Sequence, residues 1–348
     1  MTVWAEAFQV ERRGIDYRAG LAGGIATCAP LALGVALGEP EIGATACFGG
    51  LNASLGVPRG ALRERVGWGA GAALACCAAT ALTTAVQDST AASVVVCLAV
   101  VALAAFLRTF GSAGGLTGFV ISAIFVIMNG FPAAPLDTGE RVLWFALGSL
   151  VGVVLMVAAY ARDAPPPDPD ATPLATVLAR GARQYRGAIA HDAALRGHAL
   201  RLASIVAGTL LLARTLDLEH GYWIPLTILA VLQPEEHASG VRAIQRGTGT
   251  LVGTAVIVVI TIATGAQWLM ITAQAFAAFG LFALFSRGYF WLVVLLTPTA
   301  LLTLGAVDYQ GDSDALQRAA WSAVGIVIGL TVAELWWRLR PVGPAGPD

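Results

Sequence analysis

The two halves of the chain carry one residue pattern at one spacing. An arginine is followed by a tryptophan and two glycines at Arg141, Trp144, Gly148 and Gly152, and again at Arg318, Trp321, Gly325 and Gly329. Three more arginines of the first half have counterparts in the second half, in the same order and at a nearly constant distance along the chain. These pairs are Arg18 and Arg201, Arg65 and Arg246, and Arg108 and Arg287. Chance is a poor explanation for this series. We therefore expect an internal duplication, which has to be settled before a fold is assigned.

Composition indicates what kind of unit is repeated. Hydrophobic residues make up 57% of the chain and charged residues 12%, whereas a soluble domain has about 25% charged residues. The mean hydropathy is +0.73. The formal net charge of -1 argues against nucleic-acid binding. The duplicated unit is therefore expected to be a membrane unit.

Apolar runs of the length that crosses a bilayer, about 17 to 25 residues, occur in two sets of six, although several are short. They cover 19–38, 42–57, 66–86, 91–107, 115–130 and 142–161, and then 202–216, 222–234, 247–264, 268–286, 289–306 and 319–337. The sequence predicts an all-α integral membrane protein of about twelve transmembrane helices, built as two parallel six-helix repeats that form an internal pseudo-dimer.

We expect three regions along the chain. Residues 1–162 form the first six-helix repeat with an N-terminal amphipathic segment, 163–200 a cytoplasmic proline-rich linker and amphipathic helix, and 201–348 the second six-helix repeat. In two segments, 4–18 and 174–199, apolar residues are interspersed with charged residues. This pattern suits amphipathic helices that lie in the membrane interface. A solvated connector is the alternative for both.

Arginines alternate with acidic residues from one predicted gap to the next. They gather at the termini and after the even-numbered spans, while Glu39, Glu41, Asp88 and Asp137 occupy the odd-numbered gaps. By the positive-inside rule both termini and the central linker are cytoplasmic. Six spans is an even number, so both repeats have the same orientation and a pseudo-twofold axis along the membrane normal relates them. We expect a multi-pass protein of the bacterial inner membrane.

Glycine, proline and polar residues interrupt corresponding spans of the two halves. The second span contains several glycines and Asn52, and the eighth contains Pro225 and Gln233. The fifth span is glycine-rich, and the eleventh contains Thr297 beside a proline. In transporters built from repeats, such interruptions point to the binding site. Close helix packing through small residues is the alternative.

Four arginines begin spans at matched positions. Arg141 and Arg318 start the sixth and twelfth spans on the expected external side, where an arginine facing a cavity can hold a carboxylate. Alternatively, each reaches the outer interface and pairs with Glu140 or Asp314. Arg65 and Arg246 start the third and ninth spans on the inner side, where a role in setting the topology is the alternative.

These patterns select a set of substrate-binding candidates: Asn52, Arg65, Arg141, Tyr222, Trp223, Gln233, Arg246, Thr297 and Arg318. Aromatic side chains near a helix break can stack on an aromatic ring. The sequence contains no nucleophile–base or metal-ligand constellation. We therefore expect no enzymatic activity, no cofactor and no metal. Glu334 precedes Arg338 by one helical turn, which predicts a local ion pair.

One stretch of the second half resembles a known family. Residues 222–227 read Tyr-Trp-Ile-Pro-Leu-Thr and 231–234 read Val-Leu-Gln-Pro, and Arg242 and Arg246 lead into Gly-Thr-Leu-Val-Gly at 249–253. This stretch resembles the signature of the fusaric-acid-resistance family. That family includes aromatic acid exporters and is distantly similar to the aluminium-activated malate transporters of plants. The first half departs from the signature, because Gly43 to Pro58 lacks Trp-Ile-Pro.

The resemblance implies outward movement of organic anions, often aromatic carboxylates, across the inner membrane. We expect an exporter, with proton coupling left open. A passive organic-anion channel is the first alternative and a non-transport membrane assembly protein the second. The expected partners are a small organic anion and the lipid bilayer. A periplasmic adaptor protein and a homo-oligomer stay open as further partners.

The arginine alternation generates a topology prediction. Cysteines introduced at Thr172 and Asp312 should react with a membrane-impermeant thiol reagent from opposite sides, because Thr172 lies in the expected cytoplasmic linker and Asp312 in an external gap. Labelling in intact and in opened cells checks this. If both positions react in intact cells, the topology is wrong.

Overall fold

The computed structural model describes residues 3–9, 14–131, 136–163, 173–263, 267–308 and 312–339. Regular structure in these ranges is helical throughout, which confirms the all-α class. The α-helices are α1 (Val3–Ala7), α2 (Tyr17–Leu37), α3 (Pro40–Leu55), α4 (Leu62–Val86), α5 (Thr90–Ala105), α6 (Gly111–Gly130), α7 (Thr138–Ala159), α8 (Leu174–His191), α9 (Ala193–Thr215), α10 (Trp223–Val231), α11 (Glu236–Ala263), α12 (Gln267–Ala283), α13 (Tyr289–Asp308) and α14 (Asp312–Leu339). Short 3₁₀ turns are η1 (Phe106–Phe110), η2 (Ala161–Asp163) and η3 (Phe285–Arg287).

Eight stretches of the described chain are long and apolar enough to cross a membrane. Helices cover the twelve predicted segments, but α3, α10 and α12 have only 16, 9 and 17 residues. One of the eight stretches, Thr90–Gly130, combines α5 and α6 across η1. These two helices pack against each other, so the chain turns back at η1. Length and composition leave the number of crossings open, and twelve stays a prediction.

Two predicted surface helices differ from the structure. Among its described residues, the segment predicted at 4–18 contains α1 and the start of α2, and residues 14–16 before α2 are not helical. The segment predicted at 174–199 is divided at Asp192, which has an extended backbone and whose Oδ1 accepts a hydrogen bond from Leu195 N at 2.8 Å. This capping bond starts α9 and ends the continuous helix. The amphipathic helix is therefore α8 alone.

Some expectations concern residues outside the described ranges. These are the proline-rich stretch 164–172 with the labelling position Thr172, the basic residues Arg12 and Arg13, and the C-terminal segment 340–348. The side chains of Asp312 and Asp314 also lie outside the described part.

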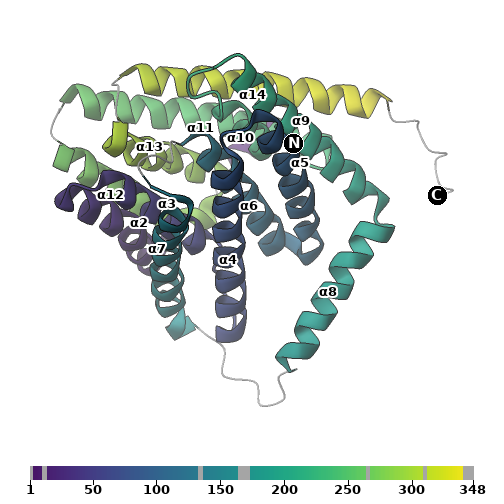
Figure 1. Cartoon of the computed structure of the whole chain (residues 1–348), viewed down its shortest axis with the longest axis horizontal. Coiled ribbons are helices and arrows are strands. Elements are labelled where there is room, and N and C mark those ends of the chain that lie inside the picture. Colours follow the sequence, from purple (N-terminus) through teal and green to yellow (C-terminus); the bar gives the residue numbers. More distant parts are fainter. Residues whose placement is uncertain are drawn as a thin grey trace.

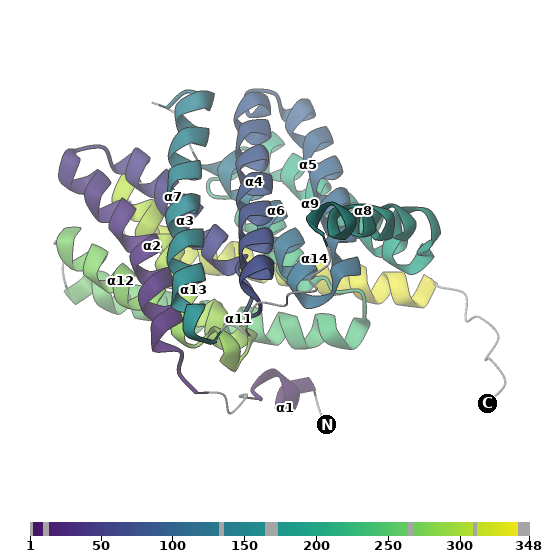
Figure 2. The ribbon, with the colours of Figure 1, turned by 90° about the horizontal axis from the view of Figure 1, so that it is seen from below.

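The first-half helices form a bundle on which second-half helices lie. Figure 2 shows α4, α5 and α7 running side by side, with α11 and α14 crossing them at a steep angle. Helix α8 lies at the periphery (Figure 1), where Tyr185 donates to Leu103 O at 2.8 Å near η1. The sequence predicts a twofold axis along the membrane normal between the two halves. If that axis relates these two sets of helices, which cross steeply, the helices of each set must be tilted from the membrane normal.

Contacts within one half recur in the other. Helix α3 packs on α7 as α10 packs on α14, and α4 contacts α6 and α7 as α11 contacts α13 and α14. Between the halves, α2 packs on α12 and α9 packs on α5, while α6 contacts α10 and α3 contacts α13. Helices α3, α6, α10 and α13 therefore make the inner contacts between the halves.

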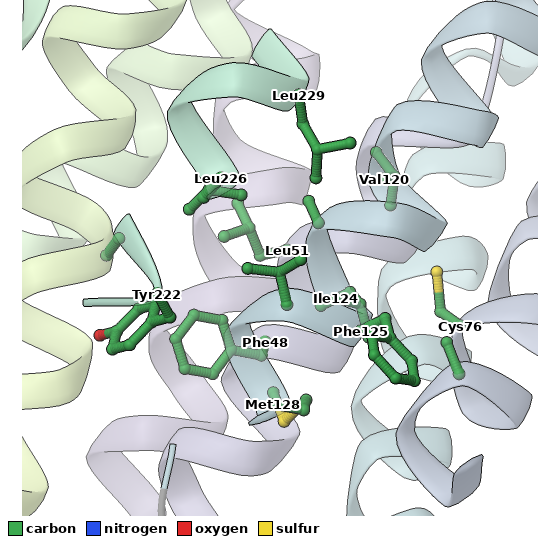
Figure 3. Packing of buried hydrophobic residues seen from close by; sticks show 14 of the residues in the cluster. Phe48, Leu51, Cys76, Val120, Ile124, Phe125, Met128, Tyr222, Leu226 and Leu229 are labelled. Carbon is green, nitrogen blue, oxygen red and sulfur yellow. The ribbon is translucent and has the colours of Figure 1, made fainter. Parts of the chain in front are cut away.

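The core between the halves is apolar. Phe48 and Leu51 of α3 face Ile124 of α6 and Leu226 of α10 (Figure 3). All nine residues of α10 are buried, as are twelve of the sixteen in α3. A helix that is buried on every side can be apolar all round, which explains why these two short helices show no polar face.

Glycines allow α3 and α7 to approach closely. A Cβ atom built on Gly148 of α7 would lie 1.9 Å from Ala46 O, and one built on Gly49 of α3 would lie 2.1 Å from Phe145 O. In the second half, a Cβ on Gly325 of α14 would lie 2.8 Å from Thr227 Cβ of α10. The repeated glycines thus pack α7 and α14 onto the short buried helices. Close helix packing through small residues, the alternative to a binding site, therefore describes Gly49, and Gly148 and Gly325 pack in the same way.

The close approach generates a stability prediction. Gly148→Ala should lower the unfolding midpoint in detergent, because the new methyl group meets a backbone carbonyl and overpacking costs about 1–3 kcal/mol. Gly71→Ala on α4 is the matched control, since nothing lies within 4 Å of its added Cβ. The control should keep or raise the midpoint through better helix propensity. Equal midpoints for both variants would contradict the packing account.

Candidate functional site

Four arginine side chains are buried inside the helix bundle. Arg65, Arg141, Arg246 and Arg318 are at most 2% exposed and lie on α4, α7, α11 and α14. Within the described part of the chain, no carboxylate lies in salt-bridge contact with any of them. A buried charge without a counter-charge is costly, and more so in a membrane. These cations are therefore the most unusual feature of the molecule.

Arg141 does not reach the outer interface, and it does not pair with Glu140. It is fully buried. Glu140 instead accepts a hydrogen bond from Asp137 N, and Glu140 N donates to Asp137 Oδ1 at 2.8 Å, which caps the start of α7. This overturns the surface-pairing alternative for Arg141. The carboxylate acts on its own helix terminus because the unpaired N–H groups there need acceptors.

Protein acceptors surround the guanidinium of Arg141. Nη1 donates to Thr84 Oγ1 and to Gln87 Oε1, each at 3.3 Å. Nη2 donates to Met128 O at 3.1 Å and to Phe131 O at 2.8 Å. These two carbonyls lie at the C-terminal end of α6, where the helix dipole is negative. The first-half arginine thus joins α7 to the ends of α4 and α6.

Arg318 has a different environment. Its guanidinium carbon lies 3.7 Å from the centroid of the Trp223 ring, and Nη2 donates to Thr297 Oγ1 at 3.4 Å. Nε and Nη1 are buried, and none of the residues that the structure describes accepts a hydrogen bond from them. The Tyr222 and Trp223 rings lie 4.8 Å apart, and Arg246 is close enough for its charge to act on Arg318. The structure therefore brings together five candidates: Tyr222, Trp223, Arg246, Thr297 and Arg318.

Tyr222 also contacts the first half of the chain. A Cβ atom on Gly130, the last residue of α6, would lie 2.1 Å from the Tyr222 ring. The ring therefore occupies space that only a glycine leaves open. The Arg318 cluster thus adjoins the end of α6, and Arg141 binds carbonyls at that same end.

The remaining candidates lie elsewhere. Arg65 Nη1 donates to Val157 O of α7 at 2.9 Å. Asn52 is 6% exposed and its amide donates to Phe48 O within α3 at 2.8 Å. Thr297 is fully buried on α13. Neither Asn52 nor Thr297 faces the perimeter.

Gln233 connects two arginines from the two halves. Its Oε1 accepts from Arg108 Nη2 at 2.6 Å, and its backbone carbonyl accepts from Arg201 Nη2 at 2.9 Å. Arg201 also contacts His198 Nδ1 at 3.3 Å. Arg108 and Arg201 belong to the repeated arginine series, and this membership was the only indication in the sequence that they matter. Their positions along the chain do not show that Gln233 binds both.

Arg214 is another residue that was not among the candidates selected from the sequence. At the end of α9 it donates to Ser93 Oγ at 3.1 Å, to Asn129 Oδ1 at 2.9 Å and to Gln87 O. Gln87 thus binds arginines of both halves, Arg141 through its side chain and Arg214 through its carbonyl. Sequence spacing has no bearing on such a contact, because the partners are more than 80 residues apart.

An open hollow of about 470 Å³ lies away from these arginines at the start of α2. Asp16 lines it and pairs with Arg59 at 2.5 Å. Partial burial acts to raise the pKa of Asp16, but the hydrogen bond from Ala19 N and the Arg59 guanidinium together hold it below its usual value. Elsewhere, Glu334 and Arg338 pair at 2.6 Å, which confirms that predicted ion pair.

The region from Trp223 to Arg318 lies within a part of the chain that matches a known protein family. Residues 203–332 match the family model described as fusaric acid resistance protein-like. This confirms the resemblance to the fusaric-acid-resistance family over that range, which includes Tyr222, Trp223, Gln233, Arg246, Thr297 and Arg318. The relation to malate transporters stays a prediction. With its many apolar helices, the chain is a multi-pass membrane protein.

Individual relatives match shorter parts of the chain. The uncharacterized protein YhfK of Escherichia coli (strain K12) is 28% identical over 137 residues, which are 39% of this chain and 20% of that protein. The uncharacterized protein ORF2 of Neisseria gonorrhoeae is 44% identical over 59 residues, 17% of this chain and 14% of that protein. The matches thus span a fifth or less of either relative. No solved structure matches the chain.

The contact between the halves at Gln233 generates a prediction. Gln233→Leu should lower the unfolding midpoint in detergent, because Arg108 loses an acceptor and such a bond to a charged group is worth about 1.5–3 kcal/mol. Gln267→Leu at the exposed start of α12 is the matched control and should leave the midpoint unchanged. A Gln233→Leu protein as stable as the control would show that the Arg108 contact contributes nothing.

Proposed function

We propose that this protein exports organic anions, and aromatic carboxylates in particular, across the bacterial inner membrane. The observation that carries the proposal is the burial of Arg246 and Arg318 within apolar helices, where no carboxylate of the described residues contacts either guanidinium. Ionisable residues inside membrane segments commonly belong to a substrate or ion pathway. The match to the fusaric acid resistance protein-like family supports the same class of function.

The proposed architecture is a pseudo-dimer of two six-helix repeats with about twelve spans and cytoplasmic termini. Recurring contacts in the two halves support it, since α3 and α7 pair as α10 and α14 do, and α2 packs on α12 as α9 packs on α5. The short buried helices α3 and α10 meet α13 and α6 between the halves. A substrate route through this region would pass the Arg318 cluster.

Aromatic residues support the choice of substrate. Tyr222 and Trp223 lie beside Arg318, so a bound carboxylate would have aromatic rings next to it. Aromatic pairing is worth about 0.5–1.5 kcal/mol beyond the burial of area, which corresponds to a roughly 2- to 12-fold preference. The proposal therefore includes a modest preference for aromatic over alicyclic carboxylates.

A flux assay tests the function. Proteoliposomes containing the full chain should release labelled terephthalate faster than protein-free liposomes, and an imposed proton gradient should increase the rate. Terephthalate is suited to this assay because two ionised carboxylates keep it from crossing lipid unaided. Cyclohexane-1,4-dicarboxylate is the matched non-aromatic control and should be released more slowly.

The outcomes separate the remaining functions. Release that follows only the gradient of terephthalate itself, and ignores the proton gradient, would favour the channel. Release at the protein-free rate under every gradient would contradict anion transport. Equal rates for the two dicarboxylates would remove the aromatic preference and leave the rest in place.

A further inference from the structure

The two repeated arginines near the outer ends of their helices have diverged in role. Resting on the proposed function, we infer that Arg318, with Arg246 and Trp223, forms the carboxylate-binding site in the second half of the chain, whereas Arg141 is a structural residue. The sequence treats Arg141 and Arg318 alike, since both are followed by a tryptophan and two glycines at the same spacing. Their surroundings differ.

Hydrogen-bond acceptors at the ends of α6 and α4 already bind the guanidinium group of Arg141. Both of its terminal nitrogens donate to protein acceptors, of which Phe131 O is nearest at 2.8 Å. Two of the acceptors are carbonyls at the C-terminal end of α6, where the helix dipole offsets a positive charge. Only Nε lacks a partner. A ligand carboxylate would have to displace these bonds to reach the Arg141 terminal nitrogens.

Arg318 has strong donors left over. It is 1% exposed, and its one hydrogen bond to the described residues, to Thr297 Oγ1, is long at 3.4 Å. Nε and Nη1 are buried and have no hydrogen-bond partner in the described part of the chain. The Trp223 ring offsets part of the charge as a cation–π partner. A buried guanidinium in this situation lacks an anion that accepts from its free N–H groups.

Arg246 increases the need for an anion. Its Nε is also buried without a partner, and its positive charge acts unfavourably on Arg318. Two like charges inside an apolar bundle repel each other strongly because the local dielectric is low. A single carboxylate near both would reduce the repulsion and satisfy the free donors.

The difference between the halves can be traced to one position on the short buried helices. Gly148 contacts Ala46 of α3, and Gly325 contacts Thr227 of α10, so Ala46 and Thr227 occupy matching places. Four residues before Thr227 is Trp223, and four residues before Ala46 is Ile42. An isoleucine has no ring face for a cation. The nearest ring to Arg141 is instead that of Phe131, whose centroid lies 5.7 Å from the guanidinium carbon, and Phe131 also supplies a backbone acceptor to Arg141.

Binding and stability together test the assignment. The full chain in lipid nanodiscs is titrated with labelled terephthalate by equilibrium dialysis, and unfolding midpoints are measured in the same preparations. Arg318→Gln should weaken binding about tenfold or more, because a charged hydrogen bond to the ligand is lost. It should not lower the midpoint, since the arginine it removes has few bonds to the protein. Arg318→Lys should restore part of the affinity.

Arg141→Gln is the matched control that the repeat supplies. It should lower the unfolding midpoint, because four protein acceptors lose their donor, and the folded fraction should bind terephthalate within about twofold of the original chain. Trp223→Leu should weaken binding like Arg318→Gln. Chloride at equal concentration should compete poorly, because a single-atom ion lacks the two oxygens with which a carboxylate accepts from two N–H groups.

Three results would overturn the assignment. The first is equal weakening of binding by Arg141→Gln and Arg318→Gln, and the second is weakening by Arg141→Gln alone. The third is an unfolding midpoint that Arg318→Gln lowers as Arg141→Gln is expected to do. In each case transport by the unsubstituted chain would still support anion export, so only the location of the site would be wrong. If the unsubstituted chain neither binds nor releases terephthalate, the proposed function fails with it.

Discussion

Guanidinium groups buried in an apolar helix bundle are the constraint on which the rest of this structure depends. Arg65, Arg141, Arg246 and Arg318 sit on four of the longer helices, and each needs compensation that lipid cannot provide. The first half compensates Arg141 with the carbonyl end of α6, and these hydrogen bonds connect that end to α7. The second half compensates Arg318 with the Trp223 ring, and the short helix α10 must be buried to bring that ring there.

Close packing and charge burial use different residues of one repeated pattern. The glycines that follow Arg141 and Arg318 let α7 and α14 lie against α3 and α10. A Cβ atom at Gly148, Gly152 or Gly325 would lie too close to these short helices. Each arginine lies about two helical turns before the first glycine, where the surroundings of the two halves differ. One pattern therefore supports a structural contact in both halves and a binding site in the second alone.

Much of the helical arrangement could be predicted from residue order. Apolar runs separated by charged gaps gave the helix positions. In the structure, Gly38 and Gly111 have a positive φ at a helix end or turn, a conformation that favours glycine. The break at Asp192 was missed, since the segment around it has the periodicity of one helix and only the capping bond to Leu195 interrupts it. Of the candidate site, Tyr222, Trp223, Thr297 and Arg318 meet, and Asn52 forms a bond within its own helix instead.

The sequence by itself determined that this is an all-helical membrane protein, that its halves share a pattern of arginines and glycines, and that its second half resembles one family. These properties follow from composition, periodicity and local spacing, all of which are local along the chain. Only the tertiary structure decided which arginine lacks acceptors, which ring lies beside it, and that Gln233 joins Arg108 to Arg201 across the two halves. The physical reason is that compensation of a buried charge depends on atoms distant in sequence, and identical local spacing places Arg141 and Arg318 in different surroundings.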